Sequence, residues 1–526
     1  MRDTERFAFS ADGPWNIDPS ALVWLRNTEA RREQLRSLVP AITQRRRLPP
    51  LSRFAVASLR LGSALLRWSI RERRQGGSTS RRGLSRRLRD AFERLGPPYI
   101  KLGQILSSGR GIFPEELVEA FRTLRDRVTP EPWEAVRQVI EEDFGTGVAN
   151  VFTHFNPEPL AAASIAQVHE AQLCSGEDVV VKVQRPRVAA LVRQDVQAMS
   201  WIAPWLVGKI PVAALANPPA LVELFAETIL EELDFRLEAA NMLAIAELLA
   251  ATGRRNVIVP RPHPVHVTER VLVMERISGI SYERVDEIRA AGVDTENLLR
   301  TLVVSLLEGA MIYGVFHGDL HGGNMVVRPT GEIGLFDFGI TGRMDPAQRL
   351  AFLRLIIHGM VGNVRAQIEA YRDLGALPPH TDVEEVIRKL RLDQPVVDPT
   401  ALSGRELARE IQYVTKTLLG FGAKLPKPLM LFVKDLIFLD DAIAHLAPDV
   451  NIFAEMVRIY SYFAQTYGEQ ILADVGVDLT QHAFDLDSFK AGLGLRPEVE
   501  HLTHRDLEKR REIIRTRLAQ ADKTRA

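Results

Sequence analysis

Cysteine is almost absent from this sequence: Cys174 is the only one among 526 residues. A single cysteine excludes an intrachain disulfide and a zinc site built from several cysteines. A run of about 18 apolar residues, which a membrane-spanning helix requires, is also missing. The nearest candidates, residues 199–216 and 429–439, are interrupted by prolines or by charged residues. We therefore expect a chain without a transmembrane helix, in a reducing, cytoplasmic setting.

Net charge is absent as well, because 67 Lys and Arg residues balance 67 Asp and Glu residues. The charge is unevenly distributed, and arginine clusters occur at residues 45–47, 71–74 and 81–89. Residues 76–80, Gly-Gly-Ser-Thr-Ser, separate two of these clusters and are typical of a flexible joint. The N-terminus has acids among its bases and no apolar core, so we expect no secretory signal.

Two interpretations of the arginine-rich segment remain open. Together with apolar residues at Trp24, Leu65, Leu66 and Trp68, it could lie on the inner face of an anionic membrane as a peripheral contact. Alternatively, it is a solvated helical extension. Nucleic acid is a weaker candidate partner, because the segment contains no recognisable reading module and the whole chain is neutral.

The most informative pattern is HGDLHGGN, which ends at Asn324 and is followed by a DFG triplet that begins at Asp337. Kinase catalytic loops place a base Asp five positions before a metal-binding Asn, and a second metal-binding Asp follows a short hairpin. Asp319, Asn324 and Asp337 match this pattern. The spacing therefore predicts a site for phosphoryl transfer.

The chemistry of these three residues fits that prediction. Asn324 and Asp337 offer the hard oxygen ligands preferred by magnesium ions that bridge nucleotide phosphates. Asp319 is left free to accept the proton of an attacking hydroxyl or to orient water. Residues 325–327 and 333–336 are typical of two short strands joined by a turn, which would carry the two ligands to neighbouring strand ends. We therefore expect ATP and Mg²⁺ as cofactors.

A candidate phosphate-binding lysine lies upstream of this loop. Lys182 is within the β-branched run Val179–Val183, which predicts a buried strand, and a buried lysine needs an anionic partner. Where a kinase has its glycine loop, this chain has Ala161, Ala162, Ala163 and Ser164. Each alanine adds a Cβ that restricts the backbone, so we expect a stiffer loop that holds phosphates through backbone amides and the Ser164 hydroxyl.

Two further elements of a nucleotide site are predicted from the chain. Glu238 is the expected partner of Lys182, within a helical stretch at residues 224–249; a solvated acidic helix face is the alternative. Residues 271–279 are typical of a strand that runs into a turn, which is the form of a kinase hinge. Backbone groups near Glu275 and Ile277 would then contact the adenine, with Met274 behind it.

Three features together resemble the UbiB-like (AarF-type) atypical kinases. Lys101–Gln104 is similar to their KxGQ motif, Glu232–Asp234 to their ExD element, and the alanine loop to theirs. The resemblance implies that the KxGQ helix covers the place where a protein substrate would dock and that its lysine pairs with the ExD acid. It further implies that Lys101 and Gln104 lie near Glu232 and Asp234 and obstruct ordinary protein phosphorylation.

The same resemblance implies an α+β, bilobal, protein-kinase-like fold with an N-terminal helical extension. We expect an arginine-rich helical extension (1–94), a KxGQ helical segment (95–150), a small lobe (151–280), a large lobe (281–450) and a helical tail (451–526). Apolar residues at three- and four-residue spacing predict helices at residues 350–361, 383–390, 405–420, 429–446 and 453–467. Residues 501–526 are highly charged, unlike the apolar membrane helices that often end family members acting in ubiquinone synthesis.

The function implied by the resemblance is that of an ATP-binding kinase or ATPase that supports isoprenoid-quinone or other lipid metabolism, with a lipid or quinone-precursor ligand. Two alternatives remain open. Small-molecule phosphotransferases of the aminoglycoside or choline kinase type also use an HGDLHxGN loop, but they generally lack KxGQ and DFG. A nucleotide-binding scaffold with little turnover is the other, although Lys182, Asp319, Asn324 and Asp337 are all intact. The phosphate acceptor and the oligomeric state stay open at this point.

Overall fold

The computed structural model describes residues 3–44, 51–75, 77–107, 114–122, 124, 129–206, 218–394, 398–481 and 484–523. Contacts within the chain divide it into two units. Unit 1 comprises Met1–Tyr282, Gly322–Arg328 and Glu332–Thr341, and unit 2 comprises Glu283–His321, Pro329–Gly331 and Gly342–Ala526. The expected mixture of helices and strands is present, whereas the five-segment division stays a prediction.

The main sheet of unit 1 has the strand order β1-β3-β4-β7-β6, with β2 paired to β3, and its pairs are antiparallel. Its strands are β1 (Phe152–Phe155), β2 (Ala161–Ala162), β3 (Ala166–Leu173), β4 (Asp178–Gln184), β6 (Pro262–Val267) and β7 (Val271–Glu275). The strand predicted around Lys182 is confirmed as β4. Its run of valines suits this central position, because β-branched side chains pack well on a pleated surface.

Side chains alternate along β4, so its two faces meet different helices. Val179, Val181 and Val183 pack with α7 (Trp133–Phe144) in one buried cluster. Lys182 points to the other face, where it contacts α10 (Phe235–Ala251). The lysine within this run of valines thereby reaches α10.

Residues near the N-terminus, after α1 (Asp3–Arg6), pack on the same unit. The N–H of Ala8 donates to the carbonyl of Ala246 at 2.9 Å, and the Ala8 carbonyl accepts from the N–H of Val259 at 3.0 Å. The indole Nε1 of Trp24 donates to the Pro264 carbonyl at 3.1 Å, and only 6% of Trp24 is exposed. Trp24 is therefore buried within unit 1, whereas the membrane interpretation required it at the surface.

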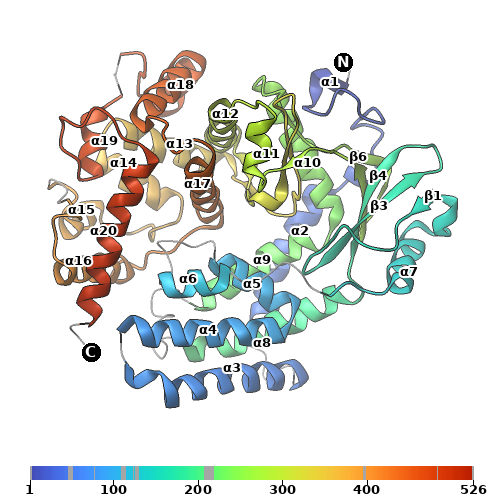
Figure 1. Ribbon diagram of the computed structural model, residues 1–526, viewed down its shortest axis with the longest axis horizontal. Helices are drawn as coiled ribbons and strands as arrows, with labels where there is room; N and C mark the ends of the chain where they lie inside the picture. The colour runs from blue at the N-terminus through green and yellow to red at the C-terminus, as the bar shows by residue number, and fades with distance from the viewer. Residues whose placement is uncertain are drawn as a thin grey trace. The chain divides into compact units, whose positions relative to one another are not determined.

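Helices form a separate layer of unit 1 (Figure 1). They are α2 (Thr28–Thr43), α3 (Leu51–Arg71), α4 (Gly77–Leu95), α5 (Pro97–Ser107), α6 (Glu115–Arg122), α8 (Val188–Leu206) and α9 (Pro218–Glu232). Helix α3 packs against α4 and α8, and α4 also packs against α5 and α6. The KxGQ segment is thus one helix, α5, within a packed helical layer.

The flexible joint predicted at residues 76–80 is wrong for its described part, because α4 begins at Gly77. Trp68 of α3 explains why this segment is ordered. Its indole Nε1 donates to the carbonyl of Ser80 at 3.0 Å and contacts the Ser80 hydroxyl at 3.1 Å. Trp68 is 8% exposed, so it too is used in packing between helices. The arginine cluster at residues 45–47 lies outside the described residues.

The helical stretch predicted over residues 224–249 is present as two helices, since α9 ends at Glu232 and α10 begins at Phe235. Asp234 causes the break. Its backbone is extended (φ −132°, ψ 98°), and its carboxylate accepts the N–H of Arg236 as the N-cap of α10. Aspartate is among the preferred N-cap residues because it satisfies an otherwise unpaired N–H group of the first turn.

A second sheet of unit 1 has the order β5-β11-β10-β8. Its strands are β5 (Val257–Ile258), β8 (Ile280–Ser281), β10 (Met325–Val327) and β11 (Ile333–Leu335). Strands β10 and β11 pair antiparallel, with Met325 opposite Leu335, which confirms the hairpin predicted between the two metal-ligand candidates.

Unit 2 is largely helical. It contains α11 (Val285–Ala290), α12 (Thr295–Glu308), α13 (Pro346–Met360), α14 (Val364–Asp373), α15 (Val383–Leu390), α16 (Gly404–Gly420), α17 (Lys427–Leu446), α18 (Ile452–Val475), α19 (Leu486–Gly492) and α20 (His504–Lys523). Short strands lie at β9 (Val315–His317) and β12 (Thr341–Arg343). The five helices predicted from apolar spacing are confirmed as α13, α15, α16, α17 and α18. Among the described residues, no helix combines the length and apolarity that crossing a membrane requires.

Candidate active site

Lys182 is the centre of a charged cluster in unit 1. Its Nζ lies 2.8 Å from Oε1 and 3.0 Å from Oε2 of Glu238, and 3.0 Å from Oδ1 of Asp337. The predicted ion pair with Glu238 is therefore present. Strand β4, helix α10 and the segment after β11 each contribute one of the three groups.

The electrostatics of this cluster follow from burial and from unequal numbers of charges. Burial alone would lower the pKa of Lys182, but Asp337 and Glu238 together raise it, so the ammonium stays charged. Burial raises the pKa of Glu238, and Lys182 opposes that shift. One cation thus faces two carboxylates, and the cluster carries an excess of negative charge when all three groups are ionised.

Asp337 is the most accessible member of the cluster, with 41% of its side chain exposed. Its backbone is left-handed (φ 56°), and its Oδ1 accepts the N–H of Gly339 at 3.3 Å. The following Phe338 is fully buried, and its carbonyl accepts from the Asn241 amide of α10 at 2.8 Å. Phe338 anchors the triplet to α10 while the Asp337 carboxylate remains open on one side.

Asn324 ends a short 3-10 turn, Gly322–Asn324, directly before β10. Its carbonyl accepts the N–H of Phe336 at 2.9 Å, so its backbone is joined to the residue before Asp337. The hairpin thus brings the two predicted metal ligands to adjacent strand ends. Asn324 is 7% exposed.

The KxGQ lysine lies beside this cluster. Lys101 Nζ is 3.1 Å from Oε2 of Glu232, and both side chains are largely buried. A Cβ atom at Gly339 would lie 3.5 Å from Glu232 Cγ and 3.8 Å from Glu238 Oε2. The ExD glutamate therefore borders the DFG triplet. Gln104 lies one turn after Lys101 on α5.

Asp234 differs from the expectation. Its carboxylate pairs with Arg31 of α2 at 3.1 Å and with Arg236 at 2.6 Å, in addition to capping α10. Its bonds therefore serve the junction of α2 and α10, whereas Glu232 alone of the two ExD acids is shown paired with Lys101.

The alanine loop forms a tight turn between β2 and β3. The N–H of Ala163 donates to the carbonyl of Ala166 at 2.8 Å, and Ser164 is 3% exposed. Arg185, which the sequence did not single out, donates from Nε to the Ala163 carbonyl at 2.9 Å. A buried guanidinium therefore adds to the restriction that the alanine side chains impose.

The predicted hinge follows β7. Met274 and Ile277 are buried, and the Glu275 carboxylate accepts the Arg261 N–H at 3.1 Å and bonds the Ser10 hydroxyl. Burial raises the pKa of Glu275, and these donors oppose the shift. The Glu275 side chain thus ties the hinge strand to the N-terminal segment, and the Glu275 N–H donates to the Arg261 carbonyl at 2.8 Å. The adenine contact that we predicted for backbone groups in this region stays a prediction.

Asp319 lies in unit 2, and the sequence did not indicate its bonds to Lys434 and His317. Its carboxylate forms an ion pair with Lys434 of α17, and its N–H donates to Nδ1 of His317 at 3.2 Å. The neighbouring Asp435 is fully buried and accepts the Leu320 N–H at 3.0 Å. Burial raises the pKa of Asp435 well above its usual range, with the Leu320 N–H opposing the shift. Two successive residues of α17 therefore bond to Asp319 and Leu320 of unit 2.

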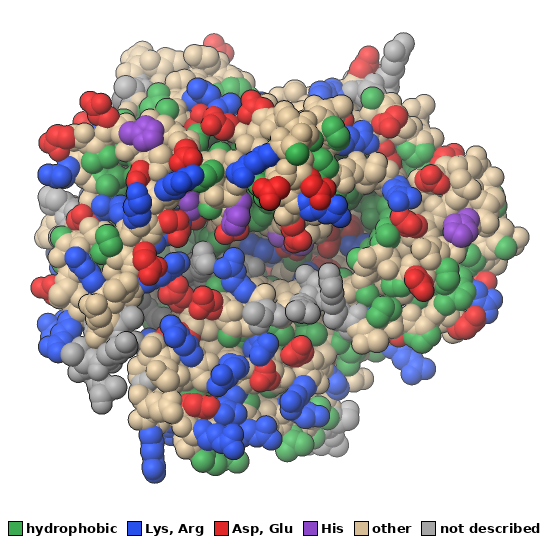
Figure 2. Space-filling model, in the orientation of Figure 1, with side chains coloured by type: hydrophobic (Ala, Val, Ile, Leu, Met, Phe, Trp, Pro, Cys, Tyr) green, Lys and Arg blue, Asp and Glu red, His purple; other side chains and the backbone are tan. Residues whose placement is uncertain are grey.

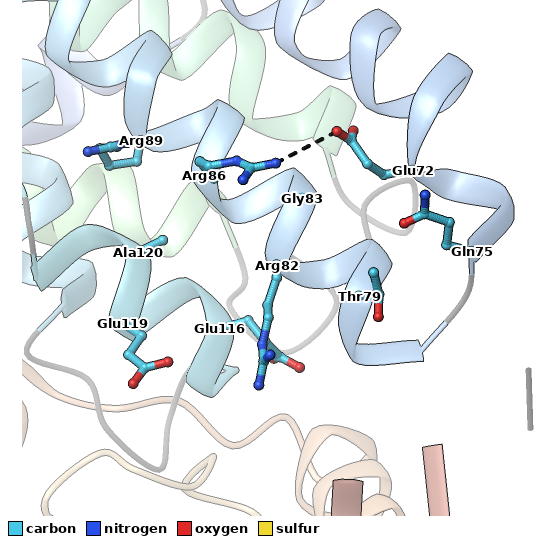
Figure 3. Close-up of a pocket in the computed structure, with 10 residues that line it drawn as sticks. All are labelled: Glu72, Gln75, Thr79, Arg82, Gly83, Arg86, Arg89, Glu116, Glu119 and Ala120. Carbon is cyan, nitrogen blue, oxygen red and sulfur yellow. Dashed lines mark ion pairs between the residues drawn. The ribbon is translucent and has the colours of Figure 1, made fainter. Parts of the chain in front are cut away.

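The arginine-rich helices carry cationic side chains at their surface (Figure 2), and some of these are paired with carboxylates. Figure 2 shows Lys and Arg side chains gathered over α3 and α4 at the lower edge of the view. Several arginines are paired within unit 1: Arg87 with Glu72 at 2.6 Å and Arg81 with Glu116 at 2.9 Å. Figure 3 shows the groove that α4 and α6 line, where Arg86 reaches Glu72. Part of the positive charge is thus neutralised by carboxylates of the same unit.

Comparison with known proteins gives a consistent result. Residues 123–371 match the model of the ABC1 atypical kinase-like domain. The uncharacterized protein Rv0647c of Mycobacterium tuberculosis is 36% identical over 385 residues, which cover 72% of this chain and 77% of that protein. The uncharacterized aarF domain-containing protein kinase At5g05200, chloroplastic, of Arabidopsis thaliana is 31% identical, covering 70% and 73%. The probable protein kinase UbiB of Marinobacter nauticus is 32% identical, covering 70% and 68%.

Proposed function

The chain belongs to the ABC1 family of atypical kinase-like proteins, which includes UbiB and aarF-type kinases, and on this premise we propose that it binds Mg-ATP as a kinase or ATPase. Membership of the family also establishes the kinase-like α+β fold. The proposal extends to a role in isoprenoid-quinone or other lipid metabolism, in which a lipid or quinone precursor is the ligand.

The observation that carries the proposal is the position of Lys182 between Glu238 and Asp337. In protein kinases the strand lysine, its helix glutamate and the DFG aspartate must all be in place before phosphoryl transfer proceeds. In unit 1, Lys182 contacts both carboxylates. Glu238 orients the lysine toward the nucleotide phosphates, which are the anions that an ammonium at this place would hold.

The donor set fits magnesium bound together with a nucleotide. Among the described residues, no group of three or more His, Cys, Asp and Glu side chains could hold a metal ion alone. Mg²⁺ is usually held by one or two protein oxygens together with substrate phosphates and water. Asp337, with its exposed carboxylate, and Asn324 would hold it, and the metal would neutralise charge that develops on the phosphates. Asp319 would accept the proton of an attacking hydroxyl or orient a water molecule.

The alanine loop and the hinge complete the proposed nucleotide site. Ala161, Ala162 and Ala163 with Ser164 would lie over the phosphates, and backbone groups near Glu275 and Ile277 would contact the adenine beside Met274. The short turn at Ala163 supports a loop with one dominant conformation. These assignments are proposals that nucleotide titration of single variants can test.

The ion pair between Lys101 and Glu232 favours this proposal over a small-molecule kinase of the aminoglycoside or choline type. Those enzymes need an open acceptor site, whereas the KxGQ helix α5 places a paired lysine beside the DFG triplet. Lys101, Gln104 and Glu232 are therefore proposed as regulatory residues that restrict protein substrates. Asp234 forms ion pairs with Arg31 and Arg236, and we propose that it contributes to this role only by capping the N-terminus of α10.

A peripheral contact with the cytoplasmic face of a membrane is the proposed location. The support comes from α3, where Leu59, Leu66 and Ile70 are 72%, 62% and 69% exposed beside arginines of the same helix. Apolar and cationic side chains on one helix favour an anionic bilayer surface. Sedimentation with anionic and with neutral vesicles measures this contact, and equal binding to both would contradict the electrostatic part of the proposal.

The proposed activity is tested by ATP titration in the presence and absence of magnesium. Asp337→Asn should lose the magnesium-dependent part of ATP affinity, because an amide is a poorer ligand than a carboxylate. Asp178→Asn, on an exposed residue at the start of β4, is the matched control and should bind as the wild type does. Magnesium-dependent binding that survives in Asp337→Asn would refute the metal assignment.

The proposed metabolic role needs a separate experiment. Quinone profiles of a deletion strain should be restored by the wild type and not by Asp337→Asn. Equal rescue by both would leave only a scaffold that does not depend on catalysis.

A further inference from the structure

Arg185 directly follows the last residue of β4, three residues after Lys182, and it is 6% exposed. A buried guanidinium is costly unless its N–H groups are satisfied, because five donors leave water at once. The bonds that Arg185 makes therefore indicate which segments it holds together.

Those bonds connect the alanine loop to the segment that precedes α7. Nε donates to the Ala163 carbonyl at 2.9 Å, and both terminal nitrogens donate to the Thr129 carbonyl at 3.0 Å. One of them also bonds Oε1 of Glu131 at 2.9 Å. The backbone N–H of Arg185 donates to the Ile165 carbonyl at 2.8 Å. Arg185 thus bonds two carbonyls at the loop and two groups of a segment more than fifty residues earlier in the chain.

A second set of bonds supports the loop through Gln167. Its Oε1 accepts the Glu131 N–H at 2.8 Å, and its Nε2 lies 2.9 Å from Nε2 of His169. The other nitrogen of His169, Nδ1, lies 2.8 Å from the Asn156 carbonyl, so it is the protonated one. Burial lowers the pKa of His169, which fits a neutral ring that accepts the Gln167 amide proton. The segment at Thr129–Glu131 is therefore fastened along the alanine loop at both Arg185 and Gln167.

We propose that Arg185 is a positioning residue for nucleotide binding, because its guanidinium fixes the Ala163 carbonyl and so holds the alanine loop in one conformation. The proposal rests on the proposed nucleotide site and deepens it. The alanine side chains limit the backbone conformations that are available to the loop, and Arg185 stabilises one of them. The relative affinity of the site for ATP and ADP then depends on Arg185 without any contact between its side chain and the nucleotide.

Hydrogen exchange tests the positioning without reference to nucleotide. In Arg185→Gln, the backbone amides of residues 163–166 should exchange about tenfold faster, the effect expected when a hydrogen bond to a charged group no longer opposes local opening. Arg185→Lys retains the charge but not the several N–H donors of the guanidinium. Its amide exchange rates should lie between those of the wild type and Arg185→Gln. Arg270→Gln removes another arginine of the same unit, one paired with Asp143 at 2.5 Å, and should leave these amides unchanged.

A double-mutant cycle tests the link to nucleotide selectivity. Ala163→Gly and Arg185→Gln should each change the ratio of ATP to ADP affinity, and the double variant should show much less than the product of the two changes. Residues that act through one loop are not additive, whereas independent residues are. Arg270→Gln combined with Ala163→Gly supplies the additive reference.

The outcomes separate this inference from the proposed function. Unchanged exchange at residues 163–166 in Arg185→Gln would overturn the positioning role, whatever the nucleotide affinities are. Multiplicative effects in the cycle would overturn the link to selectivity. If exchange is faster in Arg185→Gln but the wild type binds neither ATP nor ADP, the positioning of the loop by Arg185 would be upheld and the nucleotide site itself would be refuted.

Discussion

Two lysine–carboxylate sites in this protein differ in their charge balance. In unit 1, Lys182 is shared by Glu238 and Asp337, so carboxylates outnumber the cation. In unit 2, Lys434 pairs with Asp319, and the nearby Asp435 is a buried acid whose pKa is raised by burial. The first site thus has two carboxylates around one lysine, whereas the second has one carboxylate, that of Asp319, paired with its lysine.

The difference suggests a division of roles between the two sites. A cluster with an open, negatively charged Asp337 suits the binding of a metal–nucleotide complex. A carboxylate held by a lysine and by the fixed loop around it suits the orientation of an attacking group. If this comparison is right, removal of the two lysines should have different consequences for affinity and for turnover.

The largest effect is expected for Lys182→Met. Glu238 would be left buried without a counter-charge, and losing one partner of a buried ion pair costs about 3–5 kcal/mol. Denaturant unfolding should show this loss of stability, and ATP titration should show no binding. The double variant Lys182→Met/Glu238→Leu should recover stability but not binding. Failure to recover any stability would show that the pair is not the source of the loss.

A smaller but more selective effect is expected for Lys434→Met. Asp319 would lose its cation and its fixed orientation, and the rate of ATP turnover should fall by about 10²-fold, within the range attributed to general acid–base groups. Steady-state kinetics should show the fall in kcat with little change in KM. Lys427→Met, at the start of the same helix, is a matched control. A rise in KM with kcat unchanged would assign Lys434 to binding instead.

The smallest effect is expected for Asp435→Asn. Because burial raises the pKa of Asp435, the folded protein holds this carboxyl protonated at pH values where the unfolded chain has ionised it. Wild-type stability should therefore decrease as pH rises above about 4, until the raised pKa is reached. Asp435→Asn lacks this dependence, so its stability relative to the wild type should rise over the same range. A difference that stays constant over this range would contradict the buried, protonated acid.

The contrast also explains what the sequence could predict. The Lys182–Glu238 pair was predictable, because a lysine in a buried valine strand needs a carboxylate and the kinase motifs limit where it can lie. The hairpin between Asn324 and Asp337 was predictable from two short apolar runs and a turn. These inferences rest on local patterns or on spacings that the chemistry fixes.

The partners of Asp319 and Asp234 were not predictable, because they come from distant parts of the chain. Lys434 lies 115 residues after Asp319, and Arg31 lies 203 residues before Asp234. The only signal for Lys434 and Asp435 is that two adjacent charges interrupt an apolar helix, which we used solely to exclude a membrane span. The break between α9 and α10 did have a local signal, since Asp234 is a residue that favours N-caps.

The most direct test of the division between the two sites is calorimetric titration of ATP, with and without magnesium, into the wild type, Lys182→Met and Lys434→Met. We expect magnesium-dependent binding of similar affinity in the wild type and Lys434→Met, and none in Lys182→Met. Loss of ATP binding in Lys434→Met as complete as that in Lys182→Met would contradict this expectation.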